Sequence, residues 1–230
     1  MKANLKRTKR TMKPFMIALS LALTTFAHTA HSADSCVHEK DLLASAALIQ
    51  KEGRGKGSGV VYQGDIVLTN HHVIADIPKV WVHIPRTDQV IEAEVLHATP
   101  KPDIAVLKLK EKVKDAKELH LARRAHRREE LRLVSFPFAE KHRLGAVQAR
   151  FNNFARFKSD SRLLYFNALL SDWGFAGDSG GGFYNCKGQL VGINFGNLAL
   201  KGTPEHVYAV NMRAIEDALR AAGVEARIEY

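Results

Sequence analysis

Short segments in which apolar and polar residues alternate recur along most of the chain, and they constrain its fold more than any other feature. Alternation with a period of two puts the apolar side chains on one face of a β-strand. Polar or glycine-bearing turns separate the strands, and the first segment contains one such turn, Gln63-Gly64-Asp65. The segments are "SGVVYQGDIVLTN", "KVWVHIP", "QVIEAEVLHA", "DIAVLKLK", "LRLVSFPF", "GAVQARF", "RLLYFNALL", "GGFYN" and "QLVGINFG". Strands of this kind predict an all-β protein, built as a barrel or a sandwich.

Two stretches have the period of a helix instead. In "NMRAIEDALRAAG", residues 211–223, Asn211 is a suitable N-cap, Gly223 is a suitable end signal, and one face carries Met212, Ile215 and Leu219. We therefore expect a C-terminal helix there. A weaker helical pattern, "KELHLARRAHRREEL", contains four arginines that resemble a nucleic-acid-binding patch. Because Glu129 and Glu130 partly balance them, a solvated linker is the favoured interpretation.

The first 32 residues differ in kind from the rest of the chain. The basic segment "MKANLKRTKRTMK" is followed by the apolar run "PFMIALSLALTTFA" and then by the small residues Ala30 and Ser32. This order is typical of a secretory signal peptide, and the run is shorter than the roughly 20 residues that span a bilayer. We expect cleavage before Ala33, a mature domain of residues 33–230 with no membrane span, and an exported protein, either periplasmic or secreted.

Loss of the signal peptide changes the charge of the protein. The chain of 230 residues has a formal net charge of +10, and six of its cations leave with the signal, so the mature protein carries only +4. This mild charge removes most of the support for a nucleic-acid partner.

Two cysteines, Cys36 and Cys186, remain after cleavage. In an oxidising compartment an even pair favours one disulfide, with two free buried thiols as the alternative. A metal site is not expected, because the two residues lack the close spacing of zinc ligands.

The stretch "GDSGG", residues 177–181, carries the strongest chemical signal. A serine between glycines can sit on a tight turn with its hydroxyl exposed, and the amides of Gly177 and Ser179 can converge on a developing oxyanion. An ordinary glycine-rich turn is the alternative. A serine nucleophile needs a histidine base and a carboxylate that orients it. The candidates are the pair His71 and His72 and, at the start of an apolar strand, Asp103.

The three residue types occur along the chain in the order His, Asp, Ser. Five motifs resemble those of trypsin-like serine peptidases of the chymotrypsin fold: "GSGVVY", "LTNHHVI", "DIAVLKL", "GDSGGGFYN" and "LVGINFG". The similarity is greatest to the bacterial HtrA-like and glutamyl-endopeptidase-like types. It covers roughly residues 57–216. The PDZ domain of HtrA-like enzymes is not expected, because only a helix and "VEARIEY" follow the last strand.

The resemblance implies two six-stranded antiparallel β-barrels of the chymotrypsin/trypsin type with a C-terminal helix. The first barrel, about residues 43–112, would supply the histidine and the aspartate. A linker, residues 113–130, would lead to the second barrel, about residues 131–210, which would supply the serine and the oxyanion hole. The reaction would be hydrolysis of protein or peptide substrates through an acyl-enzyme, with no metal or organic cofactor.

The family pattern also distinguishes the two adjacent histidines. It places the base in Thr-x-x-His, so Thr69 points to His72 as the base, with Asp103 as the orienting acid and Ser179 as the nucleophile. Neighbours on a helical turn diverge by about 100°, so only one of the pair can face the serine. His71 is then a flanking residue.

The specificity pocket is predicted less sharply than the triad. The resemblance implies that Trp173 lines one wall and that Asn194, Phe195 and Gly196 line the other. Trypsins have an acid at the position nearest Trp173, and similar glutamyl endopeptidases have a histidine where this chain has Asn194. Because both are missing here, we expect an apolar or small residue before the scissile bond. A one-residue shift of the alignment, which would bring Asp172 to the position of the acid, is the alternative and would give basic specificity. Asp178 is expected either to pair with the mature N-terminus, as in trypsins, or to accept backbone hydrogen bonds.

Two functions from different classes fit the motifs. One is an exported serine endopeptidase. The other is a catalytically silent trypsin-like domain that binds a protein or peptide. Because all three triad residue types are present, the enzyme is favoured, and the sequence does not define an oligomeric state.

Overall fold

Strands dominate the computed structural model, which describes residues 36–75, 77, 79–155, 165–171, 174–197 and 206–229. The predicted signal peptide, residues 1–32, lies outside the described residues. In the part that is described, no helix has the length and apolar character needed to cross a membrane.

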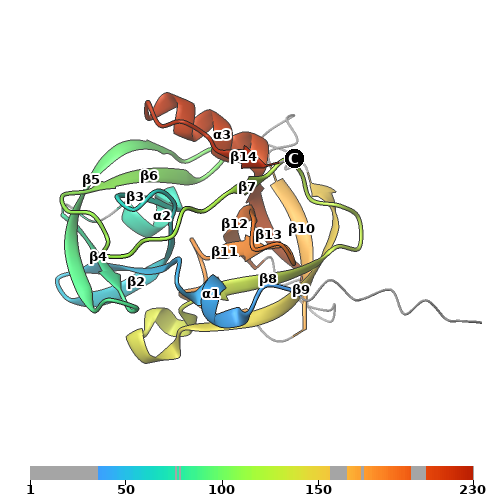
Figure 1. Ribbon diagram of the computed structural model, residues 1–230, viewed down its shortest axis with the longest axis horizontal. Helices are drawn as coiled ribbons and strands as arrows, with labels where there is room; N and C mark the ends of the chain where they lie inside the picture. Colours follow the sequence, from blue (N-terminus) through green and yellow to red (C-terminus); the bar gives the residue numbers. More distant parts are fainter. Residues whose placement is uncertain are drawn as a thin grey trace, which may run out of the picture. The chain divides into compact units, whose positions relative to one another are not determined.

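The first barrel is closed and contains only antiparallel pairs (Figure 1). Its strands pair in the order β1-β2-β3-β6-β5-β4, and β1 closes the barrel by pairing with both β2 and β4. The side chains that alternate inward from these strands fill the interior, as the sequence pattern predicts. The strands are β1 (Ala46–Lys51), β2 (Arg54–Val61), β3 (Ile66–Thr69), β4 (Val80–Ile84), β5 (Gln89–Thr99) and β6 (Ile104–Leu109).

The second barrel closes in the same way, because β11 pairs with both β8 and β12. The order around it is β11-β8-β9-β10-β13-β12. Its strands are β8 (Glu130–Ser135), β9 (Gly145–Ala155), β10 (Tyr165–Leu170), β11 (Gly182–Tyr184), β12 (Leu190–Asn197) and β13 (His206–Asn211). The helix α3 (Met212–Ala221) follows, and the Asn211 side chain accepts a hydrogen bond from the amide of Ala214. The prediction of two six-stranded antiparallel barrels and a C-terminal helix is confirmed.

The linker between the barrels is extended, so the helical interpretation of "KELHLARRAHRREEL" is wrong. It contains only the short strand β7 (Leu121–Ala122), which runs parallel to β12 and to β14 (Ile228–Glu229). The Leu121 amide donates to the carbonyl of Arg227 over 2.9 Å, and the His120 carbonyl accepts from the amide of Leu190 over 2.9 Å. These bonds to neighbouring strands replace the hydrogen bonds that a helix would make within itself. The predicted segments also omit the barrel strands β1 and β13 and the short strands β7 and β14.

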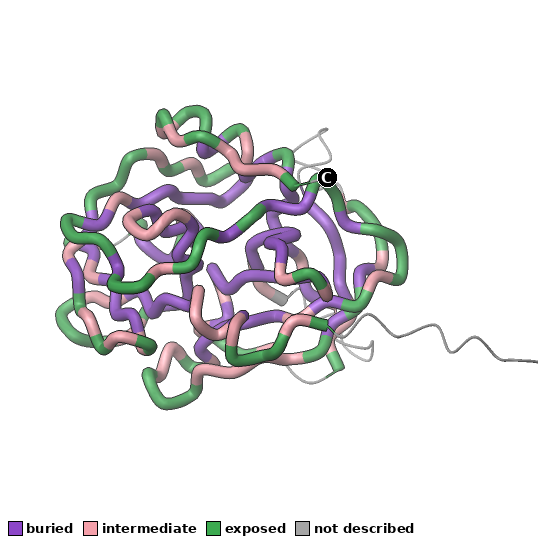
Figure 2. The backbone as a smooth tube through the Cα atoms, in the orientation of Figure 1, coloured by how far each residue is buried: buried purple, intermediate pink, exposed green. Residues whose placement is uncertain are grey.

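One apolar cluster joins the two barrels. Buried side chains of the first barrel pack in it with side chains of the second and with the inner face of α3, where Ile215 and Leu219 lie. Figure 2 shows this buried backbone running through both halves of the molecule. The first-barrel members include Leu48, Leu68 and Val106, and the second-barrel members include Phe136, Ile193 and Val210. The barrels are therefore held together by burial of apolar surface.

A disulfide between Cys36 and Cys186 fixes the start of the described chain to the turn between β11 and β12. The amide of Val37 donates to the Cys186 carbonyl over 2.9 Å next to it. The short helix α1 (Glu39–Leu43) follows directly. Two further short helices, η1 (Pro137–Ala139) and η2 (Lys141–Arg143), follow β8.

We expect the double change Cys36→Ser and Cys186→Ser to lower the free energy of unfolding by about 2–5 kcal/mol, because the bond closes a very long loop of the unfolded chain. Urea unfolding of the mature protein measures the change. Wild-type protein in reducing agent is the control and should unfold at the same urea concentration as the double variant. Equal stability of oxidised wild type and double variant would show that the cross-link contributes nothing.

Candidate active site

The end of β3 places the two histidines on a tight turn. Thr69, the last residue of β3, is fully buried, and its Oγ1 donates to the carbonyl of Ser58 on β2 over 2.7 Å. Asn70 is extended, and the four-residue helix α2 (His71–Ile74) follows it. Because Val73 and Ile74 are buried, they fix the rotation of this turn. The turn leaves the His72 imidazole accessible, with 49% of its side chain exposed.

Both carboxylate oxygens of Asp103 contact the same residue, His72. Its Oδ2 lies 2.6 Å from Nδ1 of His72, and its Oδ1 accepts from the His72 amide over 2.9 Å. Asn70 holds the aspartate from the other side, with its Nδ2 donating to the Asp103 carbonyl over 2.9 Å. An ionised carboxylate only accepts hydrogen bonds, so Nδ1 of His72 carries the proton and Nε2 presents a lone pair. The arrangement can therefore hold a neutral histidine as a base.

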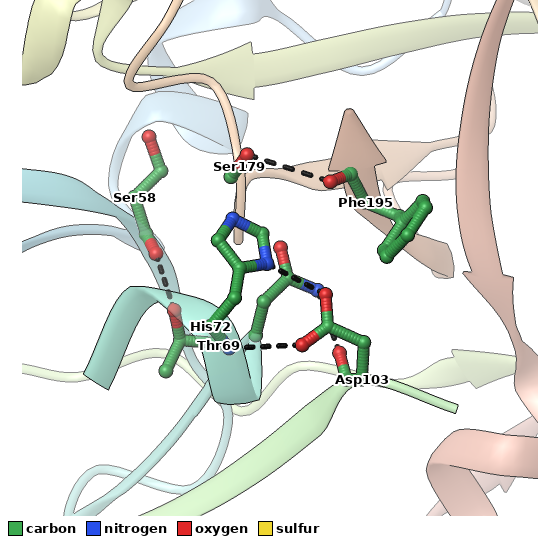
Figure 3. Close-up of polar contacts among 7 residues, drawn as sticks. Ser58, Thr69, His72, Asp103, Ser179 and Phe195 are labelled. Atoms are coloured by element: carbon green, nitrogen blue, oxygen red, sulfur yellow. Dashed lines mark hydrogen bonds and ion pairs between the residues drawn. The ribbon is translucent and has the colours of Figure 1, made fainter. Parts of the chain in front are cut away.

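Ser179 comes from the second barrel and meets this pair. Figure 3 shows the His72 imidazole between the Asp103 carboxylate and the Ser179 hydroxyl. The hydroxyl donates to the Phe195 carbonyl over 3.5 Å, which is a weak hydrogen bond. The structure thus brings together the three residues that the sequence singles out, and His71 on the same turn is not among them.

The nucleophile turn, residues 176–181, has two backbone amides that point away from the hydrogen bonds formed by its own carbonyls. The Ala176 carbonyl accepts from the Phe138 amide over 2.5 Å, and the Asp178 carbonyl accepts from the Gly181 amide over 3.0 Å. In a trans peptide the N–H points opposite to the C=O, so the amides of Gly177 and Ser179 point the other way. Within the described residues neither amide donates a hydrogen bond to a backbone carbonyl. Both are available for an oxyanion.

Gly177 is required for this turn by its conformation and its surroundings. Its φ is +100°, and a Cβ added there would lie 2.1 Å from the amide nitrogen of Ala139. Its carbonyl accepts from the Ser58 Oγ over 2.7 Å, and the same hydroxyl accepts from the Phe136 amide over 2.8 Å. The sequence motif "GSGVVY" contains Ser58, but its sequence alone does not reveal this supporting role.

Asp178 lies buried behind the nucleophile, with 4% of its surface exposed. Ser135 Oγ donates to one carboxylate oxygen over 2.8 Å, and the Phe175 amide donates to the other over 2.6 Å. Burial raises the pKa of this carboxyl above its ordinary value, and the two hydrogen bonds oppose that effect. Internal donors thus occupy both oxygens, which supports the second of the two expectations for this residue.

The predicted specificity residues take different positions. Trp173 lies outside the described residues. Asn194 is only 1% exposed, and its backbone holds the nucleophile turn by accepting from the Gly180 amide over 2.9 Å and donating to the Gly181 carbonyl over 2.7 Å.

Phe195 and Gly196 lie beside the nucleophile itself. The Phe195 ring stands edge-on to the His72 imidazole, with 6.3 Å between the ring centroids. A Cβ added to Gly196 would lie 3.9 Å from Ser179 Oγ, so this glycine keeps the space beside the hydroxyl open. Elsewhere in the described chain no group of three or more His, Cys, Asp or Glu side chains could hold a metal ion.

Comparisons with known proteins agree with this geometry. Residues 57–193 match the family model described as "Trypsin-like peptidase domain". The chain is 33% identical over 149 residues to a protein of Ectopseudomonas mendocina named "Probable periplasmic serine endoprotease DegP-like", a match that covers 63% of this chain and 30% of that relative. The chain therefore corresponds to only part of the length of such relatives.

Two solved structures have the same fold. One is the active form of a protease from M. tuberculosis, with a TM-score of 0.68, 22% identity, and coverage of 83% of this chain and 86% of that chain. The other is a serine endoprotease from Yersinia pestis, with a TM-score of 0.66, 18% identity, and coverage of 81% and 67%. Since the family model covers more than half of the chain, the protein belongs to the trypsin-like peptidase family.

Proposed function

We propose that the protein is an exported serine endopeptidase that hydrolyses peptide bonds through an acyl-enzyme. One observation carries the proposal: a His72–Asp103 pair from the first barrel faces a serine on a glycine-rich turn of the second (Figure 3). Protein or peptide chains are the proposed substrates, because this constellation attacks acyl carbonyls. No nucleic acid and no cofactor enters the proposal.

The proposed reaction follows from the tautomer of His72. Its Nε2 takes the Ser179 proton as the hydroxyl oxygen attacks the peptide carbonyl. Asp103 stabilises the imidazolium that forms, and the amides of Gly177 and Ser179 stabilise the oxyanion. His72 then protonates the leaving amine, and water attacks the acyl-enzyme with His72 again acting as the base.

Export is supported by three independent features. The first 32 residues have the composition of a signal peptide, and the relative in E. mendocina is named as periplasmic. The disulfide between Cys36 and Cys186 fits an oxidising compartment. We propose that residues 33–230 form the mature peptidase domain, with the linker 113–130 between its barrels.

We expect His72→Ala and Ser179→Ala each to lower kcat/KM for a peptide substrate by at least about 1,000-fold, because base and nucleophile act as one unit. His71→Ala is the matched control and should keep most of the activity. A fluorophosphonate probe should label Ser179 in the wild type and in His71→Ala, and it should not label Ser179→Ala. An unlabelled, well-folded wild type would instead favour a silent domain that binds protein or peptide.

We expect Gly177→Ala to lower kcat by about 100- to 1,000-fold, the effect of losing one oxyanion donor, because the added Cβ would collide with the Ala139 backbone. Gly53→Ala is the matched control, since Gly53 also has a positive φ, +76°, but no atom within 4 Å of an added Cβ. Similar activity losses in the two variants would assign the effect to backbone strain alone.

A further inference from the structure

A polar cluster that the triad does not use lies on the second barrel. Asn167 on β10 is 3% exposed, and its Oδ1 accepts hydrogen bonds from two neighbouring strands. One comes from Asn152 Nδ2 on β9 over 2.8 Å, and the other involves Nδ1 of His206 on β13, also at 2.8 Å. Asn167 is buried, Asn152 and His206 are half-buried, and the triad uses none of the three.

Strand alternation shows which side of the barrel carries the cluster. Phe166 and Ala168 on β10 point into the barrel interior with Val207 and Ala209 on β13. Residues between them point outward, and Tyr165 and Val210 on that outward side belong to the apolar cluster shared with the first barrel. By the same alternation, the side chains of Asn167 and His206 lie on the outward side with Tyr165 and Val210. The cluster therefore continues, along the strands, the face of the second barrel that meets the first.

This face leads directly to the nucleophile. The Tyr165 ring packs against the Phe195 ring with 5.7 Å between centroids, and the Phe195 carbonyl is 3.5 Å from Ser179 Oγ. Gly196, which keeps the space beside that hydroxyl open, is paired with Tyr208, and Tyr208 is paired with Asn167. Two strand spacings of about 4.8 Å thus separate Gly196 from Asn167. A substrate side chain that enters beside Gly196 and the His206 ring would together have to cover that distance.

The hydrogen bonds define which atom of His206 is free to bind. The Nδ2 of Asn167 donates to the Val207 carbonyl over 3.2 Å, which fixes the amide with its Oδ1 toward His206. An amide oxygen only accepts, so Nδ1 of His206 is the donor, whether the ring is neutral or protonated. Nε2 is then a lone pair in the neutral ring and a charged donor in the protonated ring. Among the described residues Nε2 has no hydrogen-bond partner.

Other charged groups on this outward face are few in the described chain. Arg150 on β9 is paired with Leu169 on β10, which is itself paired with His206, so the guanidinium lies two strands from the imidazole. Glu130 on β8 is paired with Arg150 on the far side. Within the described parts of β9, β10 and β13, no carboxylate stands beside His206.

We propose that His206, positioned by Asn167, binds the substrate side chain that precedes the scissile bond and selects a glutamate there. This assignment rests on the proposed endopeptidase function. The sequence expectation of an apolar or small residue considered only the positions near Trp173 and at Asn194. The fold supplies a histidine from β13 instead, and a carboxylate is the ligand that accepts a charge-assisted hydrogen bond from a protonated imidazole.

Peptides that differ only in the residue before the scissile bond, Glu, Gln or Leu, provide the test. We expect kcat/KM for the Glu peptide to exceed that for the Gln and Leu peptides, because only the Glu side chain offers a carboxylate that can accept a charge-assisted hydrogen bond from a protonated imidazole. His206→Gln should lower the Glu/Leu ratio by about 10- to 100-fold, the effect of losing a hydrogen bond to a charged group. His97→Gln, on β5 of the first barrel, is the control and should leave the ratio unchanged.

Fluorophosphonate labelling of Ser179 separates the two possible failures. Equal labelling of wild type, His206→Gln and His97→Gln shows that the variants are folded and competent, so a changed ratio then reports on specificity. A wild type that labels but prefers Leu or Gln, or a Glu/Leu ratio unmoved by His206→Gln, overturns the glutamate assignment and leaves the peptidase intact. A folded wild type without labelling or hydrolysis overturns both.

Discussion

Ser58 is the residue on which the alignment of the two barrels at the active site depends. It is fully buried on β2 of the first barrel. Its amide donates to the Ser179 carbonyl over 2.8 Å, and its Oγ donates to the Gly177 carbonyl over 2.7 Å. Its own carbonyl accepts a hydrogen bond from Oγ1 of Thr69 over 2.7 Å, and Thr69 lies three residues before His72. One fully buried residue therefore links the strand that leads to the base with the nucleophile turn.

Close packing around Ser58 leaves the nucleophile turn little freedom. A Cβ added to Gly180 would lie 2.0 Å from the Ser58 carbonyl oxygen and 2.4 Å from Thr69 Oγ1. Glycine is the only residue that fits there, and its φ of +87° is also one that side chains disfavour. The second glycine of "GDSGG" is thus explained by contact between barrels, and the first by contact with the segment after β8. The two glycines of the motif thus mark the positions where the nucleophile turn lies closest to the backbone of neighbouring segments.

The sequence predicts features that depend on local order along the chain. Alternation predicts most strands, and the spacing from Thr69 selects His72, because both depend on a few neighbouring residues. Hydrogen bonds between distant strands are not predicted. The linker has a helical sequence pattern, but the Leu121 amide donates to the carbonyl of Arg227, near the C-terminus. The role of Ser58 likewise appears only when strands of the two barrels are brought together, and that of Ser135 only when β8 meets the nucleophile turn.

The same reasoning explains why specificity is the least predictable part of the site. A family pattern assigns a role to a position, and it points to Asn194 as a wall of the pocket. In the fold the backbone of Asn194 is committed to the nucleophile turn and its side chain is buried. Two polar groups that face outward, Asn167 and His206, lie 39 residues apart and meet through the pairing of β10 with β13. Because this register alternates side chains between the core and the outward face, a shift of one residue would bury His206 in the barrel and expose Val207. In the proposed assignment, substrate selection is therefore a property of strand register, which a linear motif does not record.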